Sequence, residues 1–263
     1  MIDTHSHLLP GVDHGCPDLA TSVLMAQDAA AAGVNTVVCT PHLPEMDGAA
    51  IEHAREVITE VRAALAAAGI DLTLLLGFEV GLEIAATHQP AALEALTVEG
   101  TQGGGFGGVL VLEMPYRGWP IYLEETVFRL AAAGLRPVLA HPERNARVQK
   151  NPELLAGCLK AGAVAQATAA SIAGEFDRAT ERAFFELLSA GLMGLLATDA
   201  HAFRRDGWTL SAVLERLSGS ASPRELKTLV EENPRRLLAG EPPLRVQPVA
   251  ANGSRLRRRG HAG

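Results

Sequence analysis

The chain has 263 residues and a formal net charge of −7. Its length allows one large α/β domain or two small ones, and its negative charge argues against broad electrostatic binding to nucleic acid. Three scattered cysteines make a disulfide framework improbable and favour a reducing compartment. No apolar stretch approaches the roughly 18 residues that cross a bilayer, and the N-terminus does not resemble a signal peptide. We therefore expect a soluble cytoplasmic protein.

Short apolar runs alternate along the chain with longer segments of helical periodicity. The clearest predicted helix covers Asp47–Ala68, where apolar residues recur on one stripe. Seven runs are apolar through most of their length, which is typical of parallel strands covered on both faces. These predicted strands are Ile2–His7, Val34–Thr40, Leu72–Glu79, Val109–Glu113, Pro137–Ala140, Val164–Ala167 and Leu192–Thr198.

Glycine recurs between a predicted helix and the next predicted strand, where it can end a helix in the left-handed conformation. The five positions are Gly33, Gly69, Gly134, Gly162 and Gly191. This repetition favours αβ units over an all-α or all-β fold. We predict an α/β fold, a seven-stranded (β/α) barrel in a single domain, with an open doubly wound sheet as the alternative.

Two segments do not fit this alternation of predicted strands and helices. Gly100–Gly108 resembles a phosphate loop only in composition, because it lacks the Gly-Lys-Ser/Thr ending and precedes a strand, so we interpret it as a flexible connector. From Glu241 onward Pro, Gly and Arg dominate. We predict a barrel domain over residues 1–240 and a disordered basic tail over residues 241–263, solvated or docked on an acidic partner.

Histidine and carboxylate side chains follow the predicted strands at their C-terminal ends. In a parallel α/β barrel all these ends open on one face, so the side chains should converge there. Neutral imidazole is the commonest metal ligand in proteins, and convergence from six strands predicts a metal site. The candidate ligands are His5, His7, His42, Glu79, Glu113, His141, Asp199 and His201.

These ligands exceed what one ion needs, which indicates two or three divalent ions. A set of imidazoles and carboxylates without thiolate suits Mn²⁺, Fe or Zn²⁺. Multinuclear sites of this kind hydrolyse phosphate esters. Arg144 follows one ligand, and Arg204 and Arg205 follow another, so we propose that these arginines bind phosphate, whose oxygens match a guanidinium group.

Several motifs together resemble the PHP (polymerase and histidinol phosphatase) superfamily, and most closely the bacterial tyrosine-protein phosphatases of the CpsB/CapC type. The similarity covers roughly residues 1 to 240. The motifs are Asp3-Thr-His5-Ser-His7-Leu-Leu-Pro-Gly11, Thr40-Pro41-His42, Gly77-Phe-Glu79, Leu-Glu113-Met-Pro, His141-Pro-Glu-Arg144-Asn145 and Thr198-Asp199-Ala-His201.

The resemblance implies a distorted (β/α)7 barrel with a trinuclear, often manganese-dependent site. It assigns metal roles to the eight candidate ligands and phosphate binding to Arg144 and to Arg204 or Arg205. Where the family usually has Asp-Asp-Gly, this chain has Asp13-His14-Gly15. We retain His14 as a ligand, with Asp13 as the alternative.

The resemblance therefore implies a metal-dependent phosphatase acting on phosphotyrosine proteins, such as a bacterial tyrosine kinase that controls capsule or exopolysaccharide synthesis. Manganese is the first expected ion, with iron or zinc as alternatives. Tyr116 and Trp119 could dock the phosphotyrosine ring or pack in the core. The alternatives are a small-molecule phosphatase of the histidinol-phosphate type and a metal-binding regulatory protein. A Cys-x5-Arg phosphatase is excluded, because positions 22, 45 and 164 hold no arginine.

Overall fold

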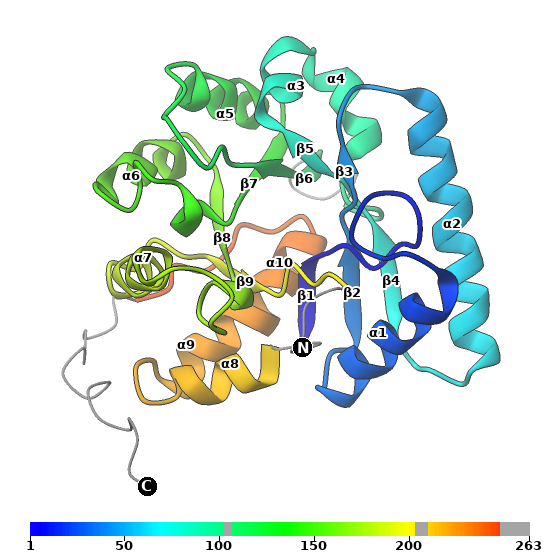
Figure 1. Ribbon diagram of the computed structural model, residues 1–263. Helices are drawn as coiled ribbons and strands as arrows, with labels where there is room; N and C mark the ends of the chain where they lie inside the picture. The colour runs from blue at the N-terminus through cyan, green and yellow to red at the C-terminus, as the bar shows by residue number, and fades with distance from the viewer. Residues whose placement is uncertain (102–106, 203–209, 248–263) are drawn as a thin grey trace, which may run out of the picture.

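The computed structural model describes residues 1–101, 107–202 and 210–247, in which parallel strands are surrounded by helices (Figure 1). The strands follow one another around the molecule in chain order. They are β1 (Ile2–Ser6), β2 (Thr36–Cys39), β3 (His42–Leu43), β4 (Thr73–Leu76), β5 (Glu79–Gly81), β6 (Gly108–Glu113), β7 (Leu135–Ala140), β8 (Val164–Thr168) and β9 (Leu195–Ala197).

Each of the seven predicted strand segments contains a strand, and two of these strands resume as a short second strand after a two-residue break. Residues 40–41 separate β2 from β3, where Pro41 has no N–H group to donate, and residues 77–78 separate β4 from β5. All strand pairs are parallel, in the ladders β1-β2-β4 and β3-β5-β6-β7-β8-β9. The two interruptions therefore divide one continuous set of strands.

The last strand returns to the first. The Asp199 N–H donates to the His5 carbonyl and the His7 N–H donates to the Ala200 carbonyl, both at 2.9 Å. The buried Asp3 carboxylate also accepts the Thr198 N–H at 3.0 Å and the Thr198 hydroxyl. The predicted (β/α)7 barrel is confirmed, and the open-sheet alternative is wrong.

Strand alternation divides the apolar residues into two clusters, because successive side chains of a strand point to opposite faces. Along β6, Leu110 and Leu112 join the outer cluster between strands and helices, whereas Val109 and Val111 join the inner cluster. The remaining described members of the inner cluster are Val38, Val98, Val138, Ala140, Val164, Leu195 and Leu237. Leu237 belongs to a helix, which therefore closes one end of the barrel.

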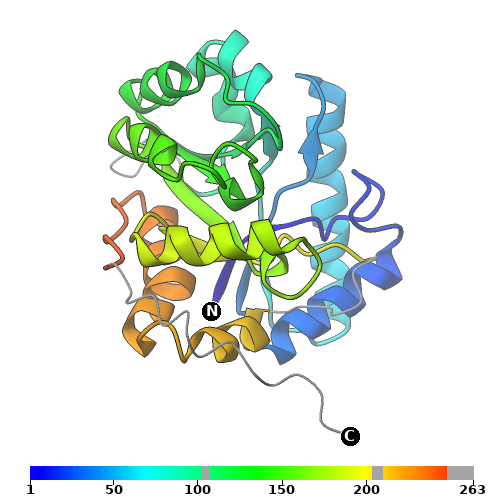
Figure 2. The same ribbon diagram turned by 60° about the vertical axis from the view of Figure 1, so that its left-hand side comes forward.

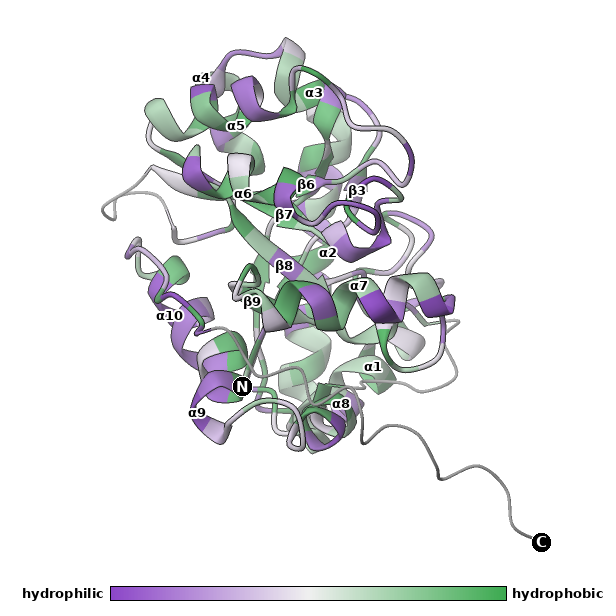
Figure 3. Cartoon of the chain, turned by 90° about the vertical axis from the view of Figure 1, so that its left-hand side faces the viewer, coloured by the Kyte–Doolittle hydropathy of each residue, from purple (hydrophilic) through white to green (hydrophobic). Residues whose placement is uncertain are grey.

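Helices cover the outside of the barrel (Figures 1 and 2). The longer ones are α1 (Leu19–Ala31), α2 (Gly48–Ala67), α5 (Leu123–Ala132), α6 (Glu153–Lys160), α7 (Arg178–Ser189) and α8 (Leu210–Leu217). The shorter ones are α3 (Leu82–Thr87), α4 (Pro90–Leu93), η1 (Glu94–Leu96), η2 (Pro142–Arg144), η3 (Ala169–Ser171), α9 (Pro223–Lys227), η4 (Thr228–Glu232) and α10 (Asn233–Leu238). Hydrophobic and hydrophilic residues alternate along α7 (Figure 3), which matches a helix packed on one side.

The structure confirms the predicted helix start and the predicted helix-end glycines. Asp47 caps α2 by accepting the Ala49 N–H at 2.9 Å, so the predicted helix over residues 47–68 is confirmed. All five predicted helix-end glycines have positive φ, between 67° and 113°. Alanine there would bear left-handed backbone strain, which explains the repeated glycine.

The start of the predicted tail packs on the barrel. The Leu244 N–H donates to the Asn233 carboxamide at 2.6 Å, and Val246 is only 3% exposed. Val246 and the Leu244 backbone thus anchor the start of this segment, although most of residues 241–247 are exposed. The rest of that segment, 248–263, lies outside the described residues, as do residues 102–106 of the predicted connector. None of the described helices combines the length and apolar character needed to cross a membrane.

Candidate metal centre

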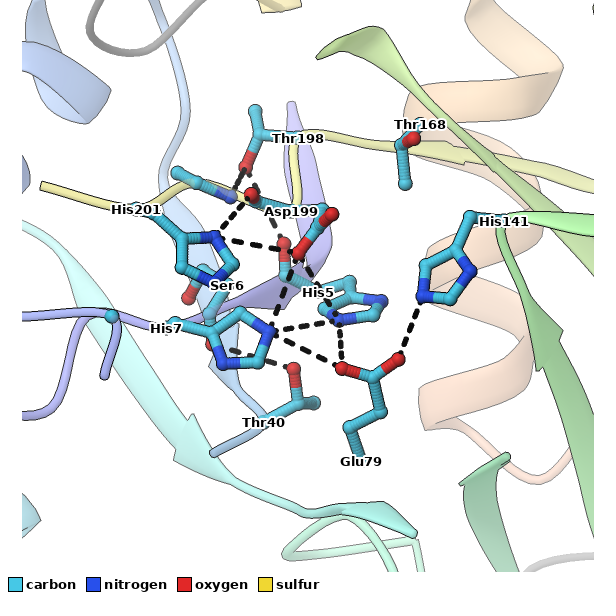
Figure 4. Close-up of polar contacts among 12 residues, drawn as sticks. His5, Ser6, His7, Thr40, Glu79, His141, Thr168, Thr198, Asp199 and His201 are labelled. Carbon is cyan, nitrogen blue, oxygen red and sulfur yellow. Dashed lines mark hydrogen bonds and ion pairs between the residues drawn. The ribbon is translucent and has the colours of Figure 1, made fainter. Parts of the chain in front are cut away.

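Two histidines and two carboxylates meet where the chain leaves the C-terminal ends of β1, β4 and β9 (Figure 4). The Nε2 atoms of His5 and His7 lie 3.2 Å apart. Glu79 Oε2 lies 3.1 Å from His5 Nε2 and 3.3 Å from His7 Nε2. Asp199 Oδ1 approaches the same two nitrogens at 3.6 and 3.3 Å. Four side chains from distant parts of the sequence thus direct nitrogen and oxygen atoms at one small volume.

The other four predicted ligands surround this centre. His141 Nε2 lies 2.8 Å from the second oxygen of Glu79. His42 Nδ1 lies 3.3 Å from Glu79 and 3.9 Å from Glu113. His201 Nδ1 lies 3.6 Å from Asp199 Oδ1. All eight side chains predicted to converge from the strand ends are therefore in one cluster.

The donor atoms fall into overlapping groups that could each hold an ion. Within each group one ligand atom per residue lies within 4.8 Å of the others. Among the described residues these groups are His7/His42/His201, His5/His7/Asp199 and His42/Glu79/Glu113. Because His7 and His42 are each shared by two groups, the geometry fits neighbouring ions better than one isolated ion.

Two buried partners orient the central histidines. Gln166 donates its amide to Thr4 Oγ1 at 2.8 Å, which turns its carbonyl oxygen to His5 Nδ1 at 2.9 Å. Asp13 Oδ2 accepts from His7 Nδ1 at 2.6 Å. In both rings Nδ1 then carries the proton, so the Nε2 lone pair faces the cluster. Such outer partners are typical of metal-binding histidine.

The Asp13-His14-Gly15 turn lies beside this centre. Asp13 uses its oxygens on the His7 ring and on the N–H groups of Gly15 and His42, so it orients a ligand and does not point into the cluster. The exposed His14 ring stacks on His42 with centroids 5.2 Å apart and lies 5.0 Å from the His201 ring. A Cβ on Gly15 would lie 2.1 Å from the His7 Cβ, so only glycine fits there.

Charge is concentrated in this centre despite its burial. Burial favours the neutral carboxyl form, but the neighbouring imidazoles outweigh it and hold the pKa of Glu79 well below its usual range. The hydrogen bond from His7 and the charge of Arg144 do the same for the pKa of Asp199 against its burial. Burial and the nearby Glu79 charge raise the pKa of Glu113. Closely spaced carboxylates and imidazoles, held without thiolate, are a donor set that fits divalent cations.

The backbone is strained at two of these positions. His141 has φ of 39° and Asp199 has φ of 55°, and these are the only non-glycine residues with positive φ in the described part of the chain. Histidine and aspartate tolerate this left-handed region better than most residues. Strain of this kind concentrates at functional sites, where it aims a side chain.

Arg144 lies next to the centre and is nearly buried, with 7% of its surface exposed. It donates to Asp199 Oδ2 and to Thr168 Oγ1, each at 2.7 Å. The Phe176 ring covers the guanidinium at 4.1 Å. The Arg144 Nε–H has no partner within the described residues. The other two predicted arginines, Arg204 and Arg205, lie outside the described residues.

The two aromatic residues predicted to dock the phosphotyrosine ring lie in different environments. The Tyr116 ring stacks on His141, with centroids 5.9 Å and planes 3° apart, and half of its surface is exposed. Trp119 is half-buried against the outer core cluster. Asn145 holds their loop by donating to the Pro115 and Gly118 carbonyls.

Sequence reasoning gave no role to several residues of this site. Glu143 Oε1 accepts the Thr168 N–H at 2.9 Å and the Ser171 hydroxyl at 2.6 Å, which ties the end of β8 to the turn after β7. Glu143 stands in the quoted His-Pro-Glu-Arg-Asn motif, which was the available signal. Phe176 gave none, because it lies in a loop without periodicity.

Comparison with known proteins agrees with this geometry. The family model described as capsular polysaccharide synthesis, CpsB/CapC, matches residues 1–239. The chain belongs to the CpsB/CapC family. Its relatives include the tyrosine-protein phosphatase YwqE of Bacillus subtilis, 32% identical over 97% of this chain and 98% of YwqE. The putative tyrosine-protein phosphatase CapC of Staphylococcus aureus is 28% identical over 88% of this chain and 86% of CapC.

Solved structures also resemble this CpsB/CapC member. A chain from the crystal structures of YwqE and of CpsB from Streptococcus pneumoniae, described as metal-dependent tyrosine phosphatases, matches with a TM-score of 0.78 and 31% identity. That match covers 95% of this chain and 98% of the other. An organophosphorus hydrolase from Deinococcus radiodurans matches at 16% identity with a TM-score of 0.56, which supports the fold alone.

Proposed function

We propose that this protein is a metal-dependent phosphatase that hydrolyses phosphotyrosine on protein substrates. The observation that carries the proposal is the cluster of imidazoles and carboxylates at the strand ends with the buried Arg144 beside it. Its family membership and the activity named for YwqE support the same reading.

The metal ligands we propose are the eight clustered residues and His14. They are His5, His7, His14, His42, Glu79, Glu113, His141, Asp199 and His201. His14 is included because its ring lies beside those of His42 and His201. We expect two or three ions, with manganese first and iron or zinc as alternatives.

Divalent ions in such a site polarise phosphoryl oxygens and lower the pKa of water. The chain's own residues hold and orient the phosphate. Arg144 is fixed by Asp199 and Thr168, so its cationic group is positioned without further ordering. Its charge would neutralise the charge that develops on the phosphoryl oxygens. Arg204 or Arg205 is the second phosphate-binding residue that we propose.

Aromatic residues beside Arg144 support an aromatic phosphate ester. Tyr116 is exposed above His141, and Phe176 covers the guanidinium. A phenyl ring attached to a phosphate at Arg144 would lie near both rings, where offset or edge contacts are favourable. Trp119 supports the loop from its half-buried position. The leaving group, a phenol with pKa about 10, needs little help from a general acid.

The family description supports a proposal for the physiological substrate. Because the CpsB/CapC family is linked to capsular polysaccharide synthesis, we propose a tyrosine kinase of capsule or exopolysaccharide synthesis as the phosphotyrosine protein. We expect the reaction in the cytoplasm.

A substrate comparison tests the proposed function. Metal-stripped protein is reloaded with Mn²⁺ and offered a phosphotyrosine peptide, the matching phosphoserine peptide and histidinol phosphate, with phosphate release as the readout. We expect turnover of the phosphotyrosine peptide that a chelator abolishes. Turnover of histidinol phosphate alone would move the protein to the small-molecule class. No turnover with Mn²⁺, Fe²⁺ or Zn²⁺ would favour the remaining alternative, a metal-binding regulatory protein.

A further inference from the structure

An open pocket of about 570 Å³ lies directly beside the candidate metal centre. Its walls come from the C-terminal ends of β3, β5 and β6 and from the start of α3. Two clustered residues, His42 and Glu113, form part of its wall. The pocket and the metal centre are thus one continuous surface.

The rest of the pocket wall is largely apolar. Three prolines from two loops, one after β3 and one after β6, stiffen it, and aliphatic side chains line it. These residues are Leu43, Pro44, Leu82, Ile84, Pro115 and Pro120. Prolines have fixed φ and no N–H group, so this wall has few donors and little freedom to collapse.

The rim of the pocket exposes further apolar surface and one acid. Ile121 is 98% exposed, between the lining residues Pro120 and Tyr122. A single exposed aliphatic residue is ordinary, but one beside an apolar pocket is typical of a binding surface. Glu83 also lines the pocket and is exposed, so an acidic ligand would be repelled.

The pocket and Arg144 lie apart, so the pocket and Arg144 can bind different parts of one substrate. Arg144 contacts residues at the ends of β8 and β9, whereas the pocket lies around β5. In the strand order β3-β5-β6-β7-β8-β9 these lie on different sides of the cluster. A phosphotyrosine with its phosphate at Arg144 leaves the pocket free for a neighbouring part of the same polypeptide.

We propose that this pocket selects the substrate sequence by taking an apolar side chain next to the phosphotyrosine. The inference rests on the proposed function, since it assigns the pocket to the same substrate. Burial of an aliphatic side chain between Leu43, Ile84 and the proline wall stabilises the bound peptide, and Glu83 disfavours an acidic neighbour.

Gly81 offers a way to fill the pocket without straining the backbone. It lines the pocket, its φ is not positive, and a Cβ built there would meet no atom within 4 Å. Gly81→Leu therefore places a side chain in the space that the substrate residue would use. Gly219, between α8 and α9, is equally open and lies outside the pocket lining. Gly219→Leu is the matched control.

The test compares three peptides that have leucine, glycine or aspartate on both sides of one phosphotyrosine. For Mn²⁺-loaded wild type we expect kcat/KM about tenfold higher for the leucine peptide than for the glycine peptide, and lowest for the aspartate peptide. Gly81→Leu should bring the leucine-to-glycine ratio close to one, and Gly219→Leu should keep it. Because the readout is a ratio within each variant, a general change in turnover cancels.

The outcomes separate the two claims. Hydrolysis of all three peptides at the same rate by wild type would overturn the pocket assignment and leave the proposed function intact. An unchanged leucine-to-glycine ratio in Gly81→Leu would also overturn the assignment. Hydrolysis of none of the peptides, nor of free phosphotyrosine, would instead contradict the proposed function.

Discussion

At the scale of single residues, Asp13 acts on the centre through His7. Its Oδ2 accepts the His7 Nδ1–H at 2.6 Å and so keeps Nε2 free for a cation. Asp13→Ala should lower Mn²⁺ affinity about 10- to 100-fold, measured by calorimetric titration. Asp18→Ala is the control, because the Asp18 side chain caps α1 by accepting the Thr21 N–H. Equal Mn²⁺ affinity in wild type and Asp13→Ala would show that this hydrogen bond has no role.

Arg144 combines a fixed position with a planar charged group. A lysine keeps the charge but cannot reproduce the two hydrogen bonds to Asp199 and Thr168 together with a phosphate contact. We expect Arg144→Lys to lower kcat/KM for a phosphotyrosine peptide by about 10²- to 10³-fold. Arg147→Lys, at an exposed position in the same segment, should have little effect. Comparable kinetics in the two variants would remove Arg144 from the mechanism.

Asp3 gives a pH-dependent contribution to stability. Burial raises its pKa from 3.8 to about 6, against the hydrogen bonds from Thr198. Because the folded-state pKa is above the unfolded value, its stabilisation is complete below pH 3.8 and is lost as the pH rises through 6.

The comparison uses wild type and Asp3→Asn, whose side chain does not titrate. Between pH 4.5 and 7.5 the free energy of unfolding of metal-stripped wild type should fall by about 2 kcal/mol relative to Asp3→Asn. Urea unfolding at both pH values measures this difference. A difference that does not change with pH would contradict the raised pKa.

At the scale of elements, α10 closes the barrel with Leu237, which is 1% exposed within the inner cluster. Leu237→Ala leaves a cavity under the strands and should lower the free energy of unfolding by about 2–4 kcal/mol. Leu24→Ala, at a position 60% exposed on α1, should cost far less. Urea unfolding of both variants gives the comparison, and equal losses would show that α10 does not seal the barrel.

The sequence predicted the elements where a repeated local signal exists. Parallel strands appear as apolar runs and helix ends as glycine, so the seven strand segments and the face that carries the ligands followed from pattern alone. The barrel seal by α10 did not, because Leu237 differs from other helix leucines only in its tertiary contacts. The predicted apolar runs also did not mark the breaks at residues 40–41, where Pro41 lacks an N–H group, and 77–78.

Sequence patterns also predicted only part of the site. Strand-end position brought all eight predicted ligands together. Asp13 as the partner of His7, and Phe176 over Arg144, depend on loop conformations that no periodic pattern determines. The hydrogen bonds from Thr198 to Asp3 likewise depend on how β9 returns to β1.

At the scale of the whole molecule, the barrel brings together proposed ligands from His5 to His201, which lie almost 200 residues apart in the sequence. The centre forms only when β9 returns to β1, so metal binding and barrel closure are linked. A cation that binds only the folded chain stabilises it by about 2.7 kcal/mol at a concentration 100 times its dissociation constant. We therefore expect Mn²⁺ to raise the melting temperature.

We propose that one multinuclear metal centre at the strand ends carries phosphotyrosine hydrolysis. The direct measurement titrates metal-stripped protein with Mn²⁺ while bound metal per chain and phosphate release from a phosphotyrosine peptide are recorded together. We predict that turnover rises with occupancy and reaches its plateau at two or three ions per chain. Full turnover in the stripped protein, or binding of several ions without any turnover, would contradict this account.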